Sequence, residues 1–346
     1  MTRLFTVLFF LFTAMSASAA QVSNLYQALV PVASQSEADR SRVAPDALKQ
    51  AIIKVVGDRK AVNNADITAL LADADRYVAR YSYQQINEDD DLTTPEQLGV
   101  NFIFDAKNLN NALQRVGLPL WGENRPEILL WLASDVGGEQ RLIGDSDESA
   151  VIELIENQAQ RRGLPMLLPV MDLEDQTQIS FSDIWTGNQS TIMSASERYG
   201  ARIIVMAQIR GNEAQTGISW QALGSEDNSR WQSEGDLNTA IANGIDQLAD
   251  MLGQRFAQQM GPSQRLAVVI SDVKDYNDYN RLVAYLNNLQ AVESVSVVSM
   301  DNQQLKVDLT IQGEVSKFRQ LLAFDGLLQA SNAVSADNTE QYRFTP

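Results

Sequence analysis

The sequence predicts a protein of mixed α and β structure (α+β or α/β), made of three small domains in tandem behind a signal peptide. Three observations lead to this prediction. Strand-like alternation and helix-like spacing of apolar residues follow one another along the whole chain. The composition changes near residue 120, and Gly261-Pro262 interrupts the chain after a long amphipathic helix. We therefore expect a signal peptide at 1–20 and domains at 21–120, 121–262 and 263–346.

The first twenty residues have the three parts of a secretory signal: basic Arg3, an apolar run at 4–15, and small residues at 16–20. The run is shorter than the roughly 20 apolar residues that a membrane-spanning helix needs. No cysteine follows it to carry a lipid anchor. We expect cleavage after Ala19 or Ala20, localisation in the bacterial periplasm, and no stable membrane insertion of the mature chain.

The expected N-terminal domain centres on one long helix. Residues 36–56 place apolar side chains on one helical face, and Gly57 follows as a stop signal. Around this helix, alternating apolar and polar residues indicate strands, and Asp105 is a candidate cap for a further helix. The expected order is a strand within 22–33, the helix, one or two short helices up to residue 78, strands at 80–86 and 98–104, and a helix from 105 to 117.

The middle segment differs from both flanks in composition. Residues 121–261 contain all five Trp, 14 of the 19 Gly and nine Arg but no Lys, so we treat this segment as a separate unit. Its strand and helix patterns alternate, which predicts a layered domain with a mixed sheet. The expected strands are 128–133, 140–143, 167–170, 201–209, 218–223 and 229–233, and the expected helices are 149–162, 190–199 and 237–260.

The last segment has the element order of a ferredoxin-like unit, β-α-β-β-α. The expected elements are a strand at 266–271, a helix at 276–289, a hairpin of strands at 292–300 and 304–311, and a helix at 315–323. One more strand would complete the unit. Two segments could supply it, 327–330 and 341–344, with a polar loop between them.

Composition excludes several classes of chemistry. The chain of 346 residues has no His and no Cys, so it lacks the base of Ser-His-Asp and Cys-His enzymes and the usual ligands of zinc, haem and iron–sulfur sites. The net charge is −17, and residues 121–261 carry 21 acidic and nine basic residues, a net charge of −12. Such a charge repels nucleic acid. We predict no cofactor, no metal site and no nucleic-acid partner.

Three short strings resemble functional motifs but lack the rest of the site. Gly144-Asp145-Ser146 is similar to the nucleophile block of GDSL-type hydrolases, which need a histidine. Ser271-Asp272-Val273-Lys274 has the Ser-x-x-Lys spacing of penicillin-interacting enzymes, but the other strings of that site are missing from the sequence. The acidic run Glu88–Asp91 lacks the alternation that wraps a calcium ion. We therefore predict no catalytic residue from motifs.

The tryptophans of the middle segment are the strongest candidates for a binding site. Trp220 and Trp231 should face each other across a hairpin, and Trp185 lies in a Gly-bounded segment. Together with neighbouring arginines they have the composition of a protein-binding hot spot. Packing in a core explains the same cluster and is the alternative that we keep open. The candidate binding residues are Trp185, Trp220, Trp231, Arg202, Arg210 and Arg230.

Four strings of the mature chain are distinctive: Leu25-Tyr26-x-x-x-Val30-Pro31-Val32-Ala33-Ser34-Gln35-Ser36, Val56-Gly57-Asp58-Arg59, Ala72-Asp73-x-x-Arg76-Tyr77-Val78 and Gly117-Leu118-Pro119-Leu120-Trp121-Gly122-x-Asn124-Arg125-Pro126. With these strings the chain resembles an uncharacterised family of secreted gamma-proteobacterial proteins, catalogued as a domain of unknown function. That family implies no reaction and no site.

A second resemblance concerns the middle segment. Tyr199-Gly200-Ala201-Arg202-Ile203-Ile204-Val205, the tryptophan hairpin and the helix at 237–260 follow one another. This layout is similar to the N-terminal domain of the Tol-system periplasmic protein and to lipoprotein activators of penicillin-binding proteins. The similarity covers a minor part of the chain and implies a partner-binding role in the cell envelope.

Two functions from different classes fit these observations. The first is a non-catalytic interaction or assembly protein of the bacterial cell envelope, with an unidentified envelope protein as its partner. The alternative is a carboxylate-dependent hydrolase acting on an envelope glycan or peptide, with Glu123 or Asp183 as an acid near the tryptophans. Two carboxylates facing each other across a cleft at about 5–9 Å would favour the enzyme.

Overall fold

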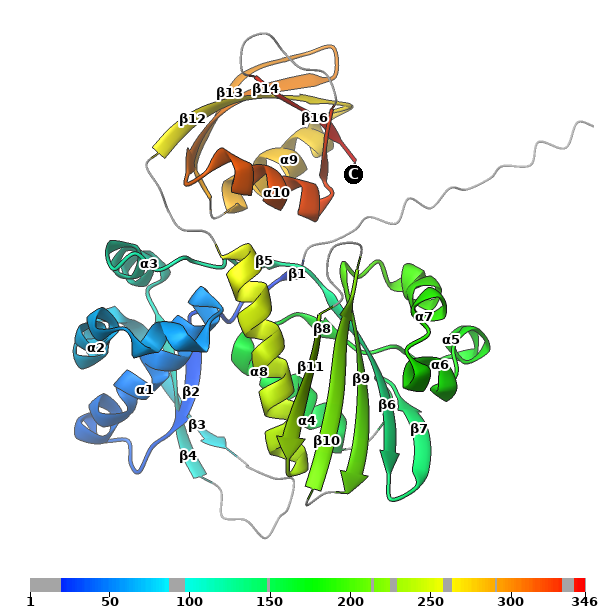
Figure 1. Cartoon of the computed structure of the whole chain (residues 1–346). Coiled ribbons are helices and arrows are strands. Elements are labelled where there is room, and N and C mark those ends of the chain that lie inside the picture. The colour runs from blue at the N-terminus through cyan, green and yellow to red at the C-terminus, as the bar shows by residue number, and fades with distance from the viewer. Residues whose placement is uncertain are drawn as a thin grey trace, which may run out of the picture.

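The computed structural model of the chain describes residues 20–86, 97–147, 150–212, 215–224, 229–257, 263–289, 291–331 and 339–345. Helices and strands alternate along the chain and form sheets with helices packed beside them, which confirms the predicted mixed α and β class (Figure 1). Within these residues, no helix is both long enough and apolar enough to span a bilayer. Apart from Ala20, the signal peptide predicted at 1–20 lies outside the described residues, as does the acidic run at 88–91.

The N-terminal part is a three-stranded antiparallel sheet covered by helix α1 (Glu37–Val56). The Ser36 side chain caps this helix by accepting a hydrogen bond from the Asp39 N–H. Gly57 ends it at a φ of 81°, a left-handed conformation that glycine adopts without strain. The strands are β2 (Gln27–Pro31), β4 (Gln97–Phe104) and β3 (Val78–Ile86) in sheet order, and the other helices are η1 (Arg59–Asn63), α2 (Ala65–Ala72), η2 (Ala74–Tyr77) and α3 (Ala106–Arg115).

The middle part is an open mixed sheet with helices on both faces (Figure 1). Its central strands β6 (Ile128–Val136) and β9 (Ile203–Asn212) pair in parallel. The sheet order is β11 (Arg230–Gly235), β10 (Gln215–Leu223), β9, β6 and β7 (Glu139–Ile143), with the short strand β8 (Met166–Leu167) also beside β6. The chain enters this part through β5 (Asn124–Arg125), which pairs with β1 (Ala20–Gln21).

The two faces of the middle sheet have separate cores. Alternate residues of β6 point to opposite sides, so Leu130 joins one core and Trp131 the other. The first core is covered by α4 (Ala150–Arg162) and α8 (Leu237–Phe256). The second is covered by α5 (Leu173–Gln178), α6 (Phe181–Thr186), α7 (Gln189–Ser196) and the short η3 (Glu197–Tyr199). Helices α5 and α6 were not predicted, because six residues are too few to show helical periodicity.

The C-terminal part has the predicted β-α-β-β-α order: β12 (Ser263–Ser271), α9 (Tyr276–Asn288), β13 (Val292–Asp301), β14 (Gln304–Gln312) and α10 (Val315–Asp325). Both candidates for one last strand then form strands, β15 (Leu328–Ala330) and β16 (Glu340–Phe344). They pair antiparallel, and β16 lies parallel to β12 and separates it from β15. A ferredoxin-like sheet would end with one strand, so the described unit carries one strand more than that pattern requires.

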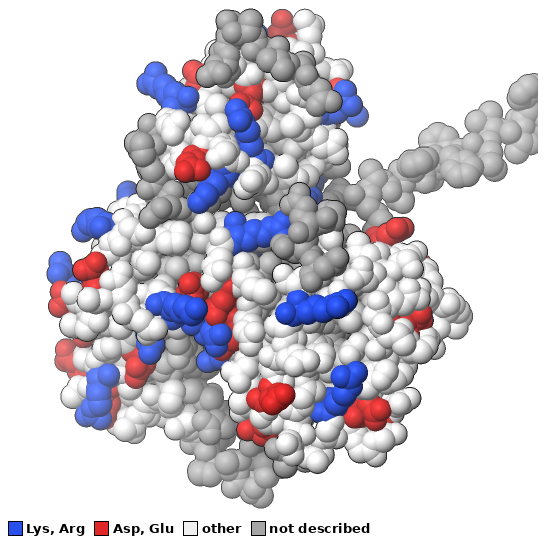
Figure 2. Space-filling model, in the orientation of Figure 1, with Lys and Arg blue, Asp and Glu red and all other residues white. Residues whose placement is uncertain are grey.

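Three regions of the chain bury separate sets of apolar side chains, whereas charged side chains of both signs lie scattered over the face that Figure 2 shows. The N-terminal core draws on residues 25–120, the middle cores on 121–257 and the C-terminal core on 266–344. A separate core does not show that a segment folds alone. The domain boundaries at 120 and 262 therefore stay a prediction.

Helix α8 lies between the N-terminal part and the middle sheet, and the end of α1 touches it (Figure 1). Gly57 and Gly253 meet there backbone against backbone. A Cβ atom placed on Gly253 would lie 2.6 Å from the carbonyl carbon and oxygen of Gly57, closer than real Cβ contacts. We call this contact, together with the polar groups around it described next, the joint.

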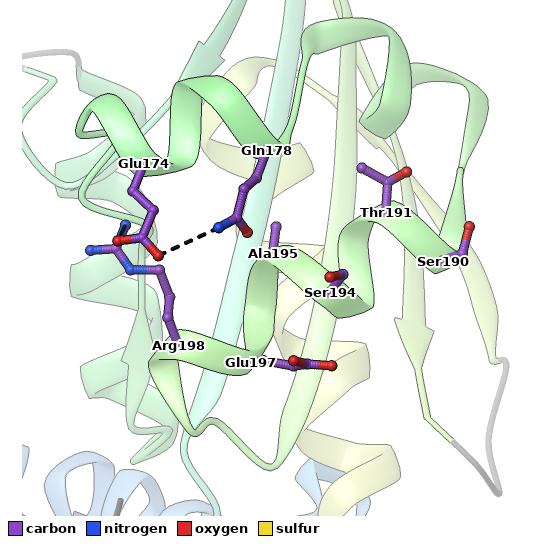
Figure 3. Close-up of a pocket in the computed structure, with 8 residues that line it drawn as sticks. All are labelled: Glu174, Gln178, Ser190, Thr191, Ser194, Ala195, Glu197 and Arg198. Carbon is purple, nitrogen blue, oxygen red and sulfur yellow. Dashed lines mark hydrogen bonds and ion pairs between the residues drawn. The ribbon is translucent and has the colours of Figure 1, made fainter. Parts of the chain in front are cut away.

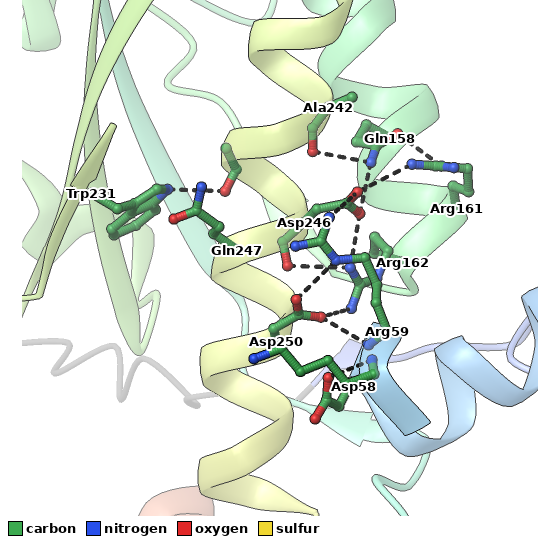
Figure 4. Close-up of polar contacts among 12 residues, drawn as sticks. Asp58, Arg59, Gln158, Arg161, Arg162, Trp231, Ala242, Asp246, Gln247 and Asp250 are labelled. Atoms are coloured by element: carbon green, nitrogen blue, oxygen red, sulfur yellow. Dashed lines mark hydrogen bonds and ion pairs between the residues drawn. The ribbon is translucent and has the colours of Figure 1, made fainter. Parts of the chain in front are cut away.

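Two aspartates of α8 bind arginines from two other segments at the joint (Figure 4). Asp250 accepts hydrogen bonds from Arg59 at 2.9 Å and Arg162 at 2.7 Å, and Asp246 accepts from the same two arginines at 2.9 and 2.8 Å. Arg162 also donates to the Gly57 carbonyl oxygen at 3.0 Å, and its side chain is only 2% exposed. Ion pairs therefore connect η1, α4 and α8, and those of Arg162 are buried whereas Arg59 is partly exposed.

Arg125 borders the joint, where it binds the carbonyl oxygens of Arg162 and Lys54, and is completely buried. Its guanidinium lies 3.9 Å from the centre of the Trp121 ring. All five of its N–H groups donate to main-chain carbonyl oxygens, which belong to Lys54, Trp121, Gly122, Arg162 and Gly163. The carbonyl groups at the ends of α1 and α4 carry the negative ends of the helix dipoles, so they stabilise the buried positive charge.

Lys54 is the third buried cation of this region, after Arg162 and Arg125. Its Nζ donates to the carbonyl oxygens of Gln27 at 2.9 Å and Asn24 at 3.4 Å. Burial, and then the nearby charge of Arg125, lowers the pKa of Lys54 to about 8. In an unfolded chain the pKa of a lysine side chain is near 10.4.

We expect this difference to appear as a pH-dependent gap between the wild-type protein and Lys54→Met. Between about pH 8 and 10 the unfolded chain holds the Lys54 proton and the folded chain has lost it, so the penalty that this buried group imposes on folding falls as pH rises. Relative to Lys54→Met, the wild type should gain about 2 kcal/mol of unfolding free energy from pH 7 to pH 10. Urea unfolding of both proteins at the two pH values measures the gap, and an unchanged gap would contradict the lowered pKa.

Candidate functional site

The segment between β8 and α5 forms a tightly held loop over residues 168–172. It passes over Gly144, where a Cβ atom would lie 2.6 Å from the Pro169 carbonyl oxygen. The Asp145 N–H donates to that same oxygen at 2.8 Å. Gly144 and Asp145 therefore support this loop, which accounts for the Gly-Asp-Ser string without a nucleophile.

Met171, within the loop, has a φ of 57°, in the left-handed region that costs a non-glycine residue about 1–3 kcal/mol. Hydrogen bonds offset this cost. The Met171 N–H donates to the Asp175 carboxylate at 2.9 Å, and its carbonyl oxygen accepts from Gln176 at 2.7 Å. The Val170 N–H donates to the Tyr199 hydroxyl oxygen at 2.9 Å. The loop is thus fixed in one conformation.

The buried carboxylate of Asp175 is the hub of this arrangement. It accepts hydrogen bonds from the Tyr199 hydroxyl and, at 3.0 Å, from Arg198. Arg198 also binds Asp172 through two hydrogen bonds of 2.7 and 2.8 Å, which hold the pKa of Asp172 well below its usual range. Burial and Asp175 raise the pKa of Tyr199 to about 12. Asp172 therefore stays ionised and Tyr199 stays protonated across the neutral range.

The loop and its helices expose apolar side chains. Leu173 is 77% exposed and Val170 is 50% exposed, and Leu167 and Met193 are exposed as well. Val170 lies in the loop, Leu173 begins α5 and Met193 lies on α7, so the exposed apolar side chains come from three neighbouring segments. We call Val170, Leu173 and Met193, with the pocket described next, the loop face.

A pocket of about 530 Å³ opens between α5 and α7 (Figure 3). On the α5 side of the pocket, the Gln178 side-chain amide donates a hydrogen bond to the Glu174 carboxylate at 3.4 Å. Its lining residues are Glu174, Gln178, Ser190, Thr191, Ser194, Ala195, Glu197 and Arg198. Leu173 lies on α5 and Met193 on α7, so each of the two helices that form the pocket also carries an exposed apolar side chain.

Two of the six predicted binding residues lie in a core. Trp220 and Trp231 are buried under α8 and stack with ring centres 6.0 Å apart. Their indole N–H groups donate to Ser233 and to the Gly244 carbonyl oxygen. The prediction that they form a binding surface is wrong, because the alternation of the hairpin strands directs both rings inward.

The other four predicted residues are divided between three places. Trp185 on α6 is half-buried, stacks on Phe181 and lies 4.4 Å from the exposed Arg210 guanidinium. Arg202 lies against Gly326 of the C-terminal part, and Arg230 is exposed on β11. Trp185 and Arg210 are on the α5–α7 side of the sheet and stay a prediction as binding residues.

The two candidate acids of a hydrolase belong to different parts of the structure. Asp183 occupies the first turn of α6, where it accepts hydrogen bonds from Ser180 and Asn188, and those from Ser180 lower its pKa. An ionised helix cap is the wrong state for a general acid. The Glu123 carbonyl oxygen accepts from Val22 beside the β1–β5 pair. In the described part of the chain, no group of three or more acidic residues is placed to hold a metal ion.

Sequence reasoning missed the loop face. Its residues are spread over 170–198 and show no motif. One signal was present: Asp172, followed by Glu174 and Asp175, is typical of a helix N-terminus, and it caps α5. The left-handed Met171 and the meeting of Asp175 with Tyr199 have no local signature, because they depend on contacts between segments.

Residues 19–122 match a family model described as Domain of unknown function (DUF8605). The predicted resemblance to a family of unknown function is confirmed over these residues. Two strings of that resemblance meet at the joint, since Gly57 and Arg59 contact α8 and Trp121 stacks on Arg125. No curated protein matches the chain significantly.

Two solved structures are similar to parts of the chain. The LpoB C-terminal domain from Salmonella enterica matches 36% of this chain and 89% of its own, with 18% identity and a TM-score of 0.24. TolB from Acinetobacter baumannii matches 44% of this chain and 33% of its own, with 13% identity and a TM-score of 0.22. At these scores neither similarity transfers a function.

Proposed function

We propose that the protein is a non-catalytic, protein-binding component of the bacterial cell envelope, and that the loop face is its binding surface. The signal-like first twenty residues support secretion to the periplasm. The observation that carries the binding role is the loop over 168–172, which is strained at Met171, held by hydrogen bonds, and exposes Val170 beside the exposed Leu173 that begins α5.

The energetics of association favour such a loop. A flexible loop loses conformational entropy when a partner binds, whereas a fixed loop has already lost it during folding. Burying the Leu173 side chain against a partner would contribute about 1.5–3 kcal/mol. Hydrogen bonds to Asp175 offset the strain of the left-handed Met171 conformation when the protein folds. The free energy gained by burying Leu173 is therefore not spent on ordering the loop.

A second feature lies on the same side of the sheet. The Trp185 ring, with Arg210 above it and Phe181 beside it, combines a flat apolar surface with a cation. Aromatic and arginine side chains are enriched in the centres of protein interfaces. An interface that covers α5 to α7 would include both Trp185 and the loop face.

Leu173→Asn is expected to abolish capture of the partner while leaving stability almost unchanged. The side chain is largely exposed, so the folded chain loses little packing when it is replaced. The measurement is photo-crosslinking in intact cells from a probe at position 170, with and without Leu173→Asn, followed by thermal unfolding of the purified variant. We expect a discrete crosslinked band that falls at least tenfold, and a midpoint within about 2 °C of the wild type.

Tyr276→Asn is the matched control, because Tyr276 on α9 is 76% exposed but lies in the C-terminal part. It should leave the crosslinked band unchanged. Loss of the band in Tyr276→Asn but not in Leu173→Asn would place binding elsewhere and contradict the proposal.

A further inference from the structure

We propose that strand β13 pairs antiparallel with β13 of a second copy of this chain, so that the two C-terminal sheets join across a two-fold axis at Ser296. This surface lies in a different part of the chain from the loop face, so the pairing and the proposed function are independent of each other. Three features of β13 support the pairing: an open edge, exposed apolar side chains along it, and a residue pattern that complements itself.

Strand β13 (Val292–Asp301) forms one edge of the C-terminal sheet. The sheet order is β13, β14, β12, β16 and β15, so β14 occupies one side of β13 and no described strand pairs with the other side. An edge strand directs N–H and C=O groups away from the sheet, where a further strand can pair with them. Natural edge strands are often protected by Lys or Pro, and β13 contains neither. Its edge is therefore open to another strand.

Two bulges limit the length of β13 that can pair. The register of β13 against β14 shifts between Val292 and Ser294, and again between Val297 and Ser299. A bulge disrupts the ladder where it occurs, so residues 294–297 form the regular part of the edge. An interface built on so short a ladder falls below the roughly 1,200 Å² of a stable complex. We therefore expect a weak dimer, with a dissociation constant on the order of tens of micromolar.

The apolar side chains of β13 are exposed on the face that forms the core in the rest of the sheet. Val297 lies opposite Val307 and Met300 lies opposite Leu305, and directly opposed residues share one face of a sheet. Val307 and Leu305 are at most 1% exposed, whereas Val297 is 39% and Met300 is 44% exposed. The core thus continues to the edge strand and stays uncovered there. A second strand beside β13 would remove this apolar surface from water.

A second copy fits this edge because the pattern of β13 is symmetric about Ser296. With the two-fold axis at Ser296, Val295 of each copy lies opposite Val297 of the other, on the core side of the sheet. An axis at Val295 would instead set Glu293 against Val297, and an axis at Val297 would set Glu293 against Asp301. Like charges directly opposite each other destabilise a strand pair. The charges at the two ends of β13 therefore favour the axis at Ser296.

The net charge of the C-terminal part is compatible with self-association. Residues 262–346 contain ten acidic and seven basic residues, a net charge of −3, whereas residues 121–261 have a net charge of −12. Repulsion between two copies is therefore smaller for a contact through the C-terminal part than for a contact through the middle segment.

Sedimentation velocity of the full mature chain, from about 1 to about 200 µM, measures the dimer. Val297→Lys should raise the dissociation constant at least about tenfold, because it puts a charge among the apolar side chains and sets the two lysines about 7–8 Å apart on the diagonal. Leu29→Lys is the matched control: Leu29 is 37% exposed on β2, an edge strand of the N-terminal sheet, and the change in charge is identical. It should leave the dissociation constant unchanged.

Single cysteines test the register, since the chain has no cysteine of its own. Ser296→Cys brings the two thiols together at the axis, so mild oxidation should link the copies by a disulfide. In Ser299→Cys the thiols are six residues apart along the strands, roughly 20 Å, which is too far for a disulfide. Both serines lie opposite exposed residues of β14 and are exposed themselves. We expect Ser296→Cys to crosslink at least about tenfold faster than Ser299→Cys.

Three results would each overturn the pairing. They are a chain that stays monomeric at about 200 µM, equal effects of Val297→Lys and Leu29→Lys on the dissociation constant, and equal crosslinking of the two cysteine variants. The last two would place self-association on another surface. Thermal unfolding shows whether Val297→Lys is folded, and if it is not, the two cysteine variants decide the question by themselves.

Discussion

Replacing Arg125 with methionine is expected to lower the free energy of unfolding by about 4 kcal/mol. Methionine has a similar length but no donor, so the variant leaves five main-chain carbonyl oxygens at the joint without their hydrogen bonds. In the folded variant these oxygens have no hydrogen-bond donor, whereas in the unfolded chain water binds them. Each unpaired oxygen therefore lowers the free energy of unfolding. The loss of stacking on Trp121 adds to the effect.

Urea unfolding followed by tryptophan fluorescence measures this effect as a shift of the midpoint. Arg125→Lys should fall between the two proteins, since an ammonium group keeps the charge but has three donors in place of five. Arg115→Met is the control, because Arg115 is exposed at the end of α3. A midpoint of Arg125→Met equal to that of Arg115→Met would show that the carbonyl groups of the joint do not need this arginine.

The second large effect is expected from the smallest change, Gly253→Ala. In an ordinary helix this substitution stabilises by up to about 1 kcal/mol, because alanine has the better helix propensity. Here the new Cβ atom would meet the backbone of Gly57 at 2.6 Å, and a backbone cannot turn aside as a side chain can. Helix α8 must move away from α1, which lengthens the hydrogen bonds of Arg162 to Gly57 and Asp250. We expect a net loss of about 3 kcal/mol.

Asn243→Ala on the exposed side of α8 supplies the reference value for propensity alone. It should stabilise slightly, whereas Gly253→Ala should destabilise by several times as much. Amide hydrogen exchange identifies where the damage lies: protection should fall at η1 and the end of α1, and remain in β12 to β16 of the C-terminal part. If Gly253→Ala is more stable than the wild type, the backbones at Gly57 and Gly253 can move apart without loss of stability, and this prediction is wrong.

The long elements of the fold were predictable because their signals are local. Helix α1 repeats its apolar residues at helical spacing between Ser36 and Gly57, and these two residues are the caps that the structure shows. The strands of the middle and C-terminal sheets lie within a few residues of their predicted bounds. Each of these signals is contained in one stretch of chain, and tertiary contacts did not change the secondary structure that it predicts.

The candidate site was not predictable in the same way. We predicted that Trp220 and Trp231 pair across a hairpin, and the strand register confirms this pairing. The sequence did not predict that both rings point toward α8. Which face of a strand is buried depends on the helix that packs on it, and α8 is contributed by a later segment. Arg202 lies against Gly326 of the C-terminal part, a contact that also depends on a segment far away in the chain.

By itself, the sequence determined the mixed α and β class, the order and extent of the long helices and strands, and the absence of histidine and cysteine chemistry. These properties depend on composition and on patterns within about twenty residues. Tertiary structure alone decided that Arg125 collects carbonyl groups from two helix ends, and that Asp175, Arg198 and Tyr199 hold Met171 in a left-handed conformation. Such contacts join residues far apart in the chain, so their geometry exists only after the helices have packed.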